Sequence, residues 1–238
     1  MRVVILQPSY IPWLGYFDQM TRADRFLYLD DVQFTRRDWR NRNKIRTKVG
    51  WSWLTVPVIQ KGRFDQSLKE TRIDNMTDWR RRHREAVRLN YARSTYFDKF
   101  FPGLESIYNK EWVFLLDLCF ETTSFVREAL KIQTPVLKSS DYKVDEDGED
   151  KVVALCQKLG ATHYLSGDAG SNYLSADEFS RKGIVLEFQE YRHPEYPQRF
   201  PGFVPYLSAI DLLFNCGDES LDILTGKNRG GENDATAS

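Results

Sequence analysis

Two short apolar runs near the start of the chain, Val3–Leu6 and Phe26–Leu29, constrain the fold more than any other feature. The segment between them is long enough for one helix and its turns, so the spacing predicts a βαβ unit with two parallel strands. Each run leads into polar and aromatic residues. In an open α/β sheet, the binding crevice lies beyond the carboxyl ends of the strands. We therefore expect residues 1–45 to form one ligand-binding unit.

Strand and helix patterns continue along the chain and alternate at both ends. Alternation of this kind predicts a mainly parallel, open, Rossmann-like α/β sheet, and the consecutive helices at about 77–131 predict a helical insertion. We expect a single domain over 1–226 and a disordered tail at 227–238, which is rich in small and polar residues. Further strands are expected at 51–58, 69–73, 134–137, 163–165 and 184–188, and helices at 77–91, 96–108, 111–130, 145–159, 175–181 and 208–215.

The composition narrows the class of protein. Of the 238 residues, 41% are hydrophobic, and 34 basic side chains balance 34 acidic ones. A packed core is therefore expected, and nucleic-acid binding through bulk charge is disfavoured. No apolar run approaches the roughly 18 residues of a membrane helix, and no signal peptide precedes the first strand, so we expect a cytoplasmic protein without membrane insertion. The scattered cysteines Cys119, Cys156 and Cys216 predict buried thiols and no zinc site.

The segment after the first strand has the composition of a ligand-binding loop. Pro8 stiffens it, and Gly15 permits close approach of a ligand or backbone at the start of the helix. Tyr10 and Trp13 can stack on a base or a sugar ring, and Gln7 precedes them at the strand end. The alternative is a rigid strand-to-helix turn with aromatic packing.

Polar groups also follow the second strand. Asp30, Asp31 and Gln33 could position an amine, bind sugar hydroxyls or hold Mg²⁺ with a phosphate, although aspartates also favour turns. The basic run from Arg36 to Lys48 suits an anionic ligand, because arginine forks match phosphate oxygens and asparagine can read a base or sugar edge. A solvated charged face is the alternative. The residues of this run that we assign to ligand binding are Arg42, Asn43 and Lys44, and Asp31 is also a catalytic candidate.

Two histidines are candidates for the group that accepts a proton. His83 shares one face of an expected helix with Trp79, and His193 follows the last strand in a proline-rich loop. Each could instead be structural.

The remaining ligand-binding candidates are Ser166, Gly167 and Tyr173, in a small-residue loop that can cradle phosphate, and Tyr196 and Gln198, in a loop that could close the crevice.

Several of these motifs together resemble the WbqC-like family. The family is associated with bacterial O-antigen and other surface-polysaccharide gene sets. The resemblance implies a transferase that forms an amide between an acyl or aminoacyl group, for example glycine, and an amino sugar, free or nucleotide-linked. The segments that carry it are Gln7–Phe17, Asp30–Phe34, Asn41–Ile45, Trp53–Pro57, Trp79 with His83, Tyr164–Gly167, Tyr173–Leu174, His193–Gln198 and Leu207–Gly217.

The opening segment also has a weaker similarity to pantothenate-synthetase-type nucleotidylyl transferases. In those enzymes ATP activates a carboxylate, so this similarity implies ATP with Mg²⁺ as cofactor. Pro12–Tyr16 lies where their His-x-Gly-His signature would fall, but only Gly15 matches, and both histidines are absent. This departure supports an alternative, a non-catalytic nucleotide- or sugar-nucleotide-binding protein of a glycan assembly system. A further alternative is an aminoacyl-tRNA-dependent transferase, with tRNA as its partner.

Overall fold

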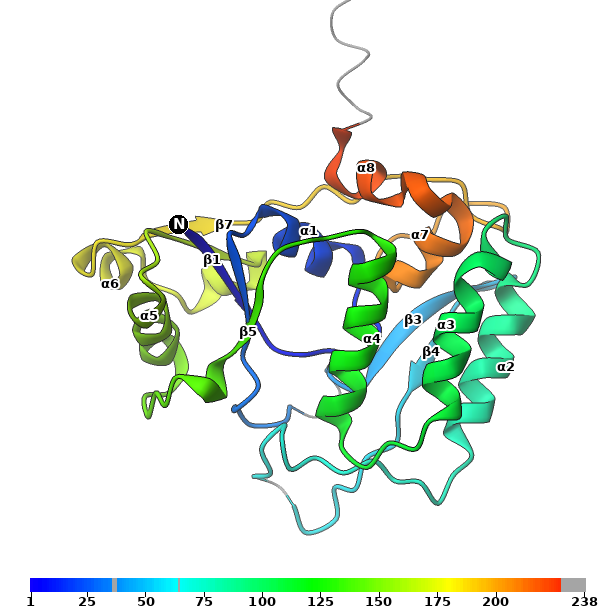
Figure 1. Ribbon diagram of the computed structural model, residues 1–238, viewed down its shortest axis with the longest axis horizontal. Coiled ribbons are helices and arrows are strands. Elements are labelled where there is room, and N and C mark those ends of the chain that lie inside the picture. Colours follow the sequence, from blue (N-terminus) through cyan, green and yellow to red (C-terminus); the bar gives the residue numbers. More distant parts are fainter. Residues whose placement is uncertain (36–37, 64, 228–238) are drawn as a thin grey trace, which may run out of the picture.

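The computed structural model describes residues 1–35, 38–63 and 65–227 and shows a layered α/β architecture (Figure 1). The strands of its main sheet are parallel and lie in the order β5-β2-β1-β6-β7. This arrangement confirms the predicted mainly parallel, Rossmann-like sheet. Residues 228–238 of the tail expected at 227–238, and Arg36 and Arg37 of the basic run, lie outside the described residues. The five strands are β1 (Arg2–Leu6), β2 (Arg25–Tyr28), β5 (Val136–Lys138), β6 (His163–Ser166) and β7 (Val185–Phe188).

Helices cover both faces of this sheet, because alternate side chains of each strand point to opposite faces. Val3 and Ile5 belong to a buried cluster with residues of α5 (Gly148–Leu159) and α6 (Ala176–Arg181). Val4 belongs to the other cluster, which includes residues of α1 (Leu14–Arg22) and of the helical block. Figure 1 shows α5 and α6 on one side of the sheet and α1 with the helical block on the other.

The predicted helical insertion is present. Helices α2 (Trp79–Tyr91), α3 (Phe97–Asn109) and α4 (Leu115–Ala129) follow one another between the second and third strands of the parallel sheet. Helix α4 begins later than predicted, because Phe114 is extended and pairs with Arg72. Helices α7 (Ala209–Cys216) and α8 (Ser220–Thr225) end the described chain, and the second of them was not predicted. None of the described helices is long and apolar enough to cross a membrane.

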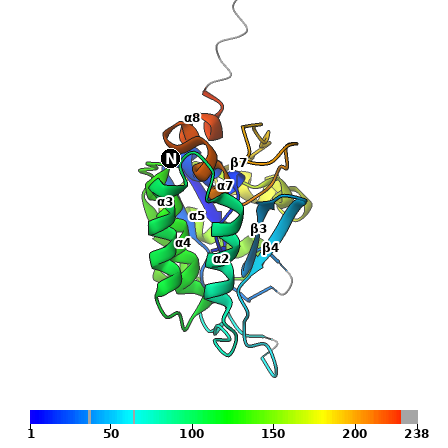
Figure 2. The same cartoon turned by 90° about the vertical axis from the view of Figure 1, so that its right-hand side faces the viewer.

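A separate antiparallel hairpin, β3 (Arg42–Thr47) and β4 (Gly50–Thr55), lies beside α2 (Figure 2). The sequence indicated the basic run but no strand within it, since its charged residues hide the alternation of buried Asn43 and Ile45. The strand predicted at 69–73 is wrong, because Ile73 takes part only in an isolated bridge with Val58.

Candidate functional site

A cavity of about 300 Å³ opens at the carboxyl ends of the parallel strands, where the strand order reverses between β1 and β6. From β1 the chain goes to β2 on one side, and it later returns to β6 on the other side. Such a switch point leaves a crevice in which ligands of open α/β sheets bind. Gln7 comes from the end of β1, Gly167 and Asp168 from the end of β6, and Gln189 from the end of β7.

Three larger hollows, of about 600, 440 and 400 Å³, lie elsewhere on the molecule. The first is formed by the irregular segment from Gly62 to Arg72, and the second lies between α1 and α8. The third lies between α4 and the strands β2 and β5. All three are more open to solvent than the switch-point cavity, and none lies where the strand order reverses. We therefore take the switch-point cavity as the candidate site.

Helix α1 and the segment before β3 complete its wall. Trp13, Tyr16 and Gln19 follow one another at intervals of three, so they share one face of α1. The wall thus combines amides, indoles, a phenol and a guanidinium. Pro12, Trp13, Tyr16 and Gln19 come from α1 and the turn before it, and Trp39, Arg40 and Asn43 come from the segment before β3 and from β3 itself. Leu6 of β1, Ser9 and Ala169 complete the wall.

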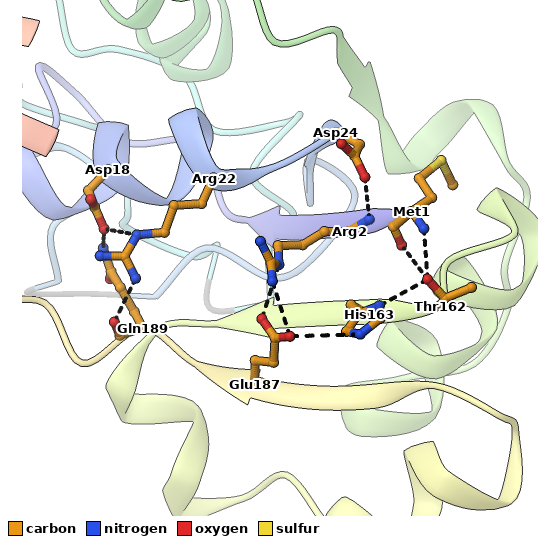
Figure 3. Close-up of polar contacts among 9 residues, drawn as sticks. All are labelled: Met1, Arg2, Asp18, Arg22, Asp24, Thr162, His163, Glu187 and Gln189. Carbon is orange, nitrogen blue, oxygen red and sulfur yellow. Dashed lines mark hydrogen bonds and ion pairs between the residues drawn. The ribbon is translucent and has the colours of Figure 1, made fainter.

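A chain of hydrogen bonds fixes the orientation of the Gln19 amide. Gln189 Nε2 donates to the carbonyl oxygen of Gly15 at 2.8 Å and to Asp18 Oδ2 at 2.7 Å, and Figure 3 shows Gln189 beside Asp18 and Arg22. A carbonyl can only accept, so Gln189 must turn its oxygen the other way, where it accepts from Gln19 Nε2 at 2.9 Å. Gln19 is thereby left with Oε1, an acceptor, as its free amide atom.

The Asp18 carboxylate that anchors this chain is itself buried. Burial raises the pKa of Asp18, and hydrogen bonds from Gln189 and the guanidinium of Arg22, whose Nε lies 3.0 Å from Asp18 Oδ2, oppose the rise. Arg22 also donates to the carbonyl oxygen of Gln189 at 3.0 Å (Figure 3). The same two side chains therefore support the end of β7 and the wall of the cavity.

Four buried polar atoms of the wall have no hydrogen-bond partner among the described residues. They are Gln7 Oε1, Tyr16 OH, Gln19 Oε1 and Arg40 Nε. Buried polar groups are normally paired, and each unpaired group costs about 1–3 kcal/mol. Burial raises the pKa of Tyr16 well above its ordinary value, so its phenol stays protonated and can donate a hydrogen bond. The four residues that line the cavity thus hold two acceptor atoms and two donor atoms without a partner among the described residues.

Of the residues that the sequence assigns to ligand binding, four line this cavity: Gln7, Trp13, Asn43 and Gly167. Gly15 lies under the indole of Trp13, since a Cβ atom there would come within 2.2 Å of that ring. Gly15 thus sets the position of Trp13. Pro8 is buried next to Gln7 but is not part of the wall.

The aspartates after β2 lie on the other side of the switch point, towards β5. Asp30 accepts hydrogen bonds from the backbone nitrogen and the hydroxyl of Ser140, and its own backbone nitrogen donates to Ser139 Oγ. Asp31 accepts from Ser139 and from Lys151 Nζ, the latter at 3.0 Å. Burial raises the pKa of Asp31, but the bonds from Ser139 and Lys151 outweigh it and lower the pKa overall. Both carboxylates hold loops together, and neither lines the cavity.

His83 is buried inside the helical side of the molecule and lines no part of the cavity wall. Its Nδ1 lies 2.9 Å from the hydroxyl of Tyr10, and its Nε2 lies 3.1 Å from the carbonyl oxygen of Thr55. Burial lowers the pKa of His83 to about 4. Tyr10 is fully buried in the same network, so its ring is not presented to the cavity.

His193 lies one layer behind the cavity wall. Its Nδ1 is 2.8 Å from the carbonyl oxygen of Pro194, and its Nε2 accepts from the backbone nitrogen of Tyr206 at 3.1 Å. The ring of Tyr206 contacts both His193 and Trp13, at centroid distances of 5.1 and 5.8 Å. His193, which the sequence indicated as a proton acceptor, therefore lies where it can position Trp13 through the ring of Tyr206.

The remaining candidates occupy other environments. Tyr196 and Gln198 donate to the fully buried Asp211, whose pKa burial raises to about 6. Ser166 is buried and donates to the carbonyl oxygen of Gly167, whereas Tyr173 is exposed. Gln33 pairs with Ser67 in an isolated bridge, and Arg42 and Lys44 lie on the outward face of the hairpin.

Sequence reasoning missed Tyr16, Gln19, Trp39, Arg40, Asp168 and Gln189. The spacing of Trp13, Tyr16 and Gln19 was a usable signal, because it places three polar-tipped residues on one helix face directly after a strand end. Gln189 gave no such signal, since its role depends on where β7 lies. Among the described residues, no group of three or more His, Cys, Asp and Glu side chains could hold a metal ion.

The profile of the WbqC-like protein family matches residues 7–223, which include every residue of the cavity wall except Leu6. The chain belongs to the WbqC-like protein family. A Mycobacterium tuberculosis (strain ATCC 25618 / H37Rv) protein named "Uncharacterized protein Rv1507c" is 40% identical over 227 residues, which cover 94% of this chain and 97% of that protein. No solved structure matches the chain. The predicted WbqC-like membership is thus confirmed.

Proposed function

We propose that this WbqC-like protein binds a nucleotide-linked amino sugar in the switch-point cavity and transfers an acyl or aminoacyl group, for example glycine, to its amino group. The observation that carries the proposal is the set of unpaired polar atoms of Gln7, Tyr16, Gln19 and Arg40 around one cavity. Amides and a phenol suit sugar hydroxyls or a base edge. The terminal nitrogens of Arg40 already contact Gln7, Ser9 and Asp38, and its Nε is the guanidinium nitrogen without a partner among the described residues. We further propose that this transfer belongs to the biosynthesis of O-antigen or another surface polysaccharide, which is the setting that the resemblance to the family implies.

The size of the cavity supports binding of one part of such a ligand. About 300 Å³ is at the lower end of the range for small-molecule sites. A sugar ring or a nucleoside fits this space, and the rest of a nucleotide-linked sugar would extend past Trp39 and Arg40 at the rim. The indole of Trp13 offers a flat apolar surface to a ring inside the cavity.

In the proposed reaction, the amine of the sugar attacks the carbonyl carbon of an activated acyl donor. The new C–N bond forms, the bond to the leaving group breaks, and the amine loses a proton. Asp168 is the carboxylate of the cavity wall, with Oδ1 held by the backbone nitrogen of Glu190 at 2.8 Å. We therefore assign proton acceptance to Asp168 in place of His83, His193 and Asp31.

Activation of the donor by ATP with Mg²⁺ does not match this set of residues. A triphosphate with its cation calls for several positive groups and for carboxylates free to reach the metal. The cavity wall holds Arg40 and Asp168, and the carboxylates of Asp30 and Asp31 are hydrogen-bonded elsewhere. The proposal therefore has the donor arrive already activated, as a thioester or as an aminoacyl-tRNA.

Mass spectrometry of reaction mixtures tests the proposal. Purified protein would be mixed with a nucleotide-linked amino sugar and, in separate reactions, a glycyl thioester, glycyl-tRNA, or glycine with ATP and Mg²⁺. The expected product has the mass of the amino sugar plus one acyl group and is absent with Asp168→Asn. No product from any donor, across uridine-, thymidine- and guanosine-linked amino sugars, would refute transfer.

A second candidate function is non-catalytic binding of a nucleotide or nucleotide-linked sugar within a glycan assembly system. It is favoured by the placement of His83 and His193 outside the cavity, because no histidine among the described residues then serves as a base. Ligand binding that depends on Tyr16 while no donor gives a product would support this candidate over transfer.

A further inference from the structure

The outward face of the β3–β4 hairpin carries large aromatic side chains that are open to solvent. Residues on this face alternate with Asn43, Ile45 and Leu54, which are buried. Trp51 is 46% exposed, and Trp39, which precedes the hairpin, is 38% exposed. Figure 2 shows the hairpin beside α2 at the edge of the molecule. Exposed aromatics that gather in one patch mark binding surfaces more often than scattered ones do.

The three tryptophans of this patch form one continuous surface. The ring centroids of Trp39 and Trp53 are 5.2 Å apart, and those of Trp51 and Trp53 are 5.5 Å apart. The side chains of Lys44 and Arg42 lie over these rings, with Lys44 Nζ 4.3 Å from the Trp51 centroid and the Arg42 guanidinium 4.3 Å from the Trp53 centroid. Cation–π contacts of this kind hold the rings in place and set positive charge among them.

Stability of the hairpin accounts for only part of this arrangement. Lys44 and Trp53 are direct cross-strand partners, and such pairs stabilise an antiparallel ladder. Trp39, however, lies outside both strands, and Trp51 leaves nearly half its surface in water. A structural role alone would bury these rings, because an indole is among the most apolar of side chains.

The patch is continuous with the switch-point cavity. Trp39 belongs to both, and Arg40 and Asn43 connect the cavity wall to the start of β3. A ligand too large for the cavity would therefore leave it across Trp39 and meet Trp53 and Lys44 next.

We propose that Trp39, Trp51 and Trp53, with Lys44 and Arg42, form a binding subsite for an acidic oligosaccharide. Indole faces pack on the apolar C–H face of a pyranose ring, and the two cations suit a sugar carboxylate. The link between this subsite and an acceptor sugar in the cavity rests on the proposed function, whereas oligosaccharide binding by the patch does not.

A nucleic acid matches the patch less well than an acidic oligosaccharide does. Its affinity comes mainly from cations that neutralise successive phosphates. Arg46, the third cation at an outward position of β3, is buried and donates to the carbonyl oxygens of Thr47, Gly50, Pro201 and Gly202. Among the residues that the structure describes, the face thus carries two cations, Arg42 and Lys44, beside three indoles.

Titration with defined oligogalacturonates, followed by tryptophan fluorescence and calorimetry, tests the subsite. We expect the wild-type protein to bind these oligomers. Trp51→Ala is expected to weaken the binding by about tenfold, which corresponds to one lost stacking contact. Lys44→Met is expected to weaken binding of acidic oligomers more than binding of neutral maltooligosaccharides. Leu89→Ala, at an exposed apolar residue of α2, is the matched control and is expected to bind as the wild type does.

Several results would overturn the subsite. One is failure of every acidic and neutral oligomer to bind; another is equal affinity of wild type and Trp51→Ala when circular dichroism shows both folded. Tighter, strongly salt-dependent binding of single-stranded RNA would identify a nucleic-acid surface instead. Tyr16→Phe separates the two proposals, because it is expected to weaken nucleotide-sugar binding in the cavity and to leave oligosaccharide binding unchanged.

Discussion

Gln19 Nε2 donates a 2.9 Å hydrogen bond to Gln189 Oε1, and this bond decides which atom Gln19 keeps free. Gln189 is held by Gly15 and Asp18, so it cannot offer its own amide nitrogen to Gln19. Two segments far apart in sequence, the face of α1 and the end of β7, thus fix an acceptor at the cavity wall. A ligand that meets this atom must present an N–H or O–H group.

Removal of the Gln189 side chain tests this orientation. Gln189→Ala leaves Asp18 Oδ2, the carbonyl of Gly15 and Gln19 Nε2 each short of a partner, so we expect the free energy of unfolding to fall by about 1–3 kcal/mol. Urea denaturation measures the change, with Lys182→Ala, at an exposed position near β7, as control. A Gln189→Ala protein as stable as the wild type would show that these bonds do not support the wall.

Gly15 is expected to tolerate no side chain. In Gly15→Ala the new Cβ would meet the Trp13 indole at 2.2 Å, so the ring must leave its place in the wall. Overpacking of this kind costs about 1–3 kcal/mol of stability. Tryptophan fluorescence and urea denaturation measure both effects, and Thr21→Ala, near the end of the same helix, serves as the control. Unchanged emission and stability in Gly15→Ala would contradict the observed contact.

The buried imidazole of His83 makes a pH-dependent contribution to stability. Its pKa is about 4 in the folded protein against an ordinary value of 6.5, so the unfolded chain binds the proton more strongly between these values. The contribution is complete above pH 6.5 and is lost as the pH falls towards 4. Relative to His83→Gln, we expect the wild type to lose about 2–3 kcal/mol between pH 7 and pH 4.5.

The test must use the difference in unfolding free energy between wild type and His83→Gln, because titration of Asp211 changes stability with pH in the opposite direction. Burial raises its pKa to about 6, so its contribution to stability is lost as the pH rises through that value. This term is common to wild type and His83→Gln and cancels in the difference of their unfolding free energies at each pH. A difference that stays constant from pH 7 to 4.5 would contradict the buried, neutral state of His83.

Asp31 is expected to matter for stability and not for ligand binding. Asp31→Asn removes the charge that pairs with the buried ammonium of Lys151, so we expect a loss of about 1–3 kcal/mol in unfolding free energy. Calorimetric titration with a nucleotide-linked sugar is expected to give the wild-type affinity. A large loss of affinity in a folded Asp31→Asn protein would restore Asp31 to the site.

The main elements of the fold could be predicted from the sequence because they carry local signals. Val3–Leu6 and Phe26–Leu29 are continuous apolar runs, as strands buried on both faces must be, and the αL conformation of Gly160 ends α5 where the sequence placed the stop. The hairpin strand at Arg42–Thr47 was hidden because its exposed face is charged. Its buried partners, Asn43 and Ile45, show the alternation only once the neighbouring helix is known.

The site was harder to predict because it depends on strand order. Gln7 and Trp13 could be named from their place after β1, which is a local property. Gln189 and Asp168 join them only because β6 and β7 lie beside β1, which no local pattern specifies. Motifs of polar and aromatic residues are typical both of ligand sites and of buried hydrogen-bond networks. The sequence therefore indicated site roles for His83, Tyr10, Tyr196 and Gln198, whereas the structure places them in buried networks.

The most direct test compares ligand affinity with stability in Gln7→Leu and Tyr16→Phe. Each variant removes a buried polar atom without a partner among the described residues, so the unfolding free energy is expected to stay the same or rise. If the cavity binds a nucleotide-linked sugar, calorimetric titration will show affinity weakened by about tenfold for each lost ligand contact. Wild-type affinity in both variants, or no binding of any nucleotide-linked sugar by the wild type, would contradict the assignment of the switch-point cavity as the ligand site.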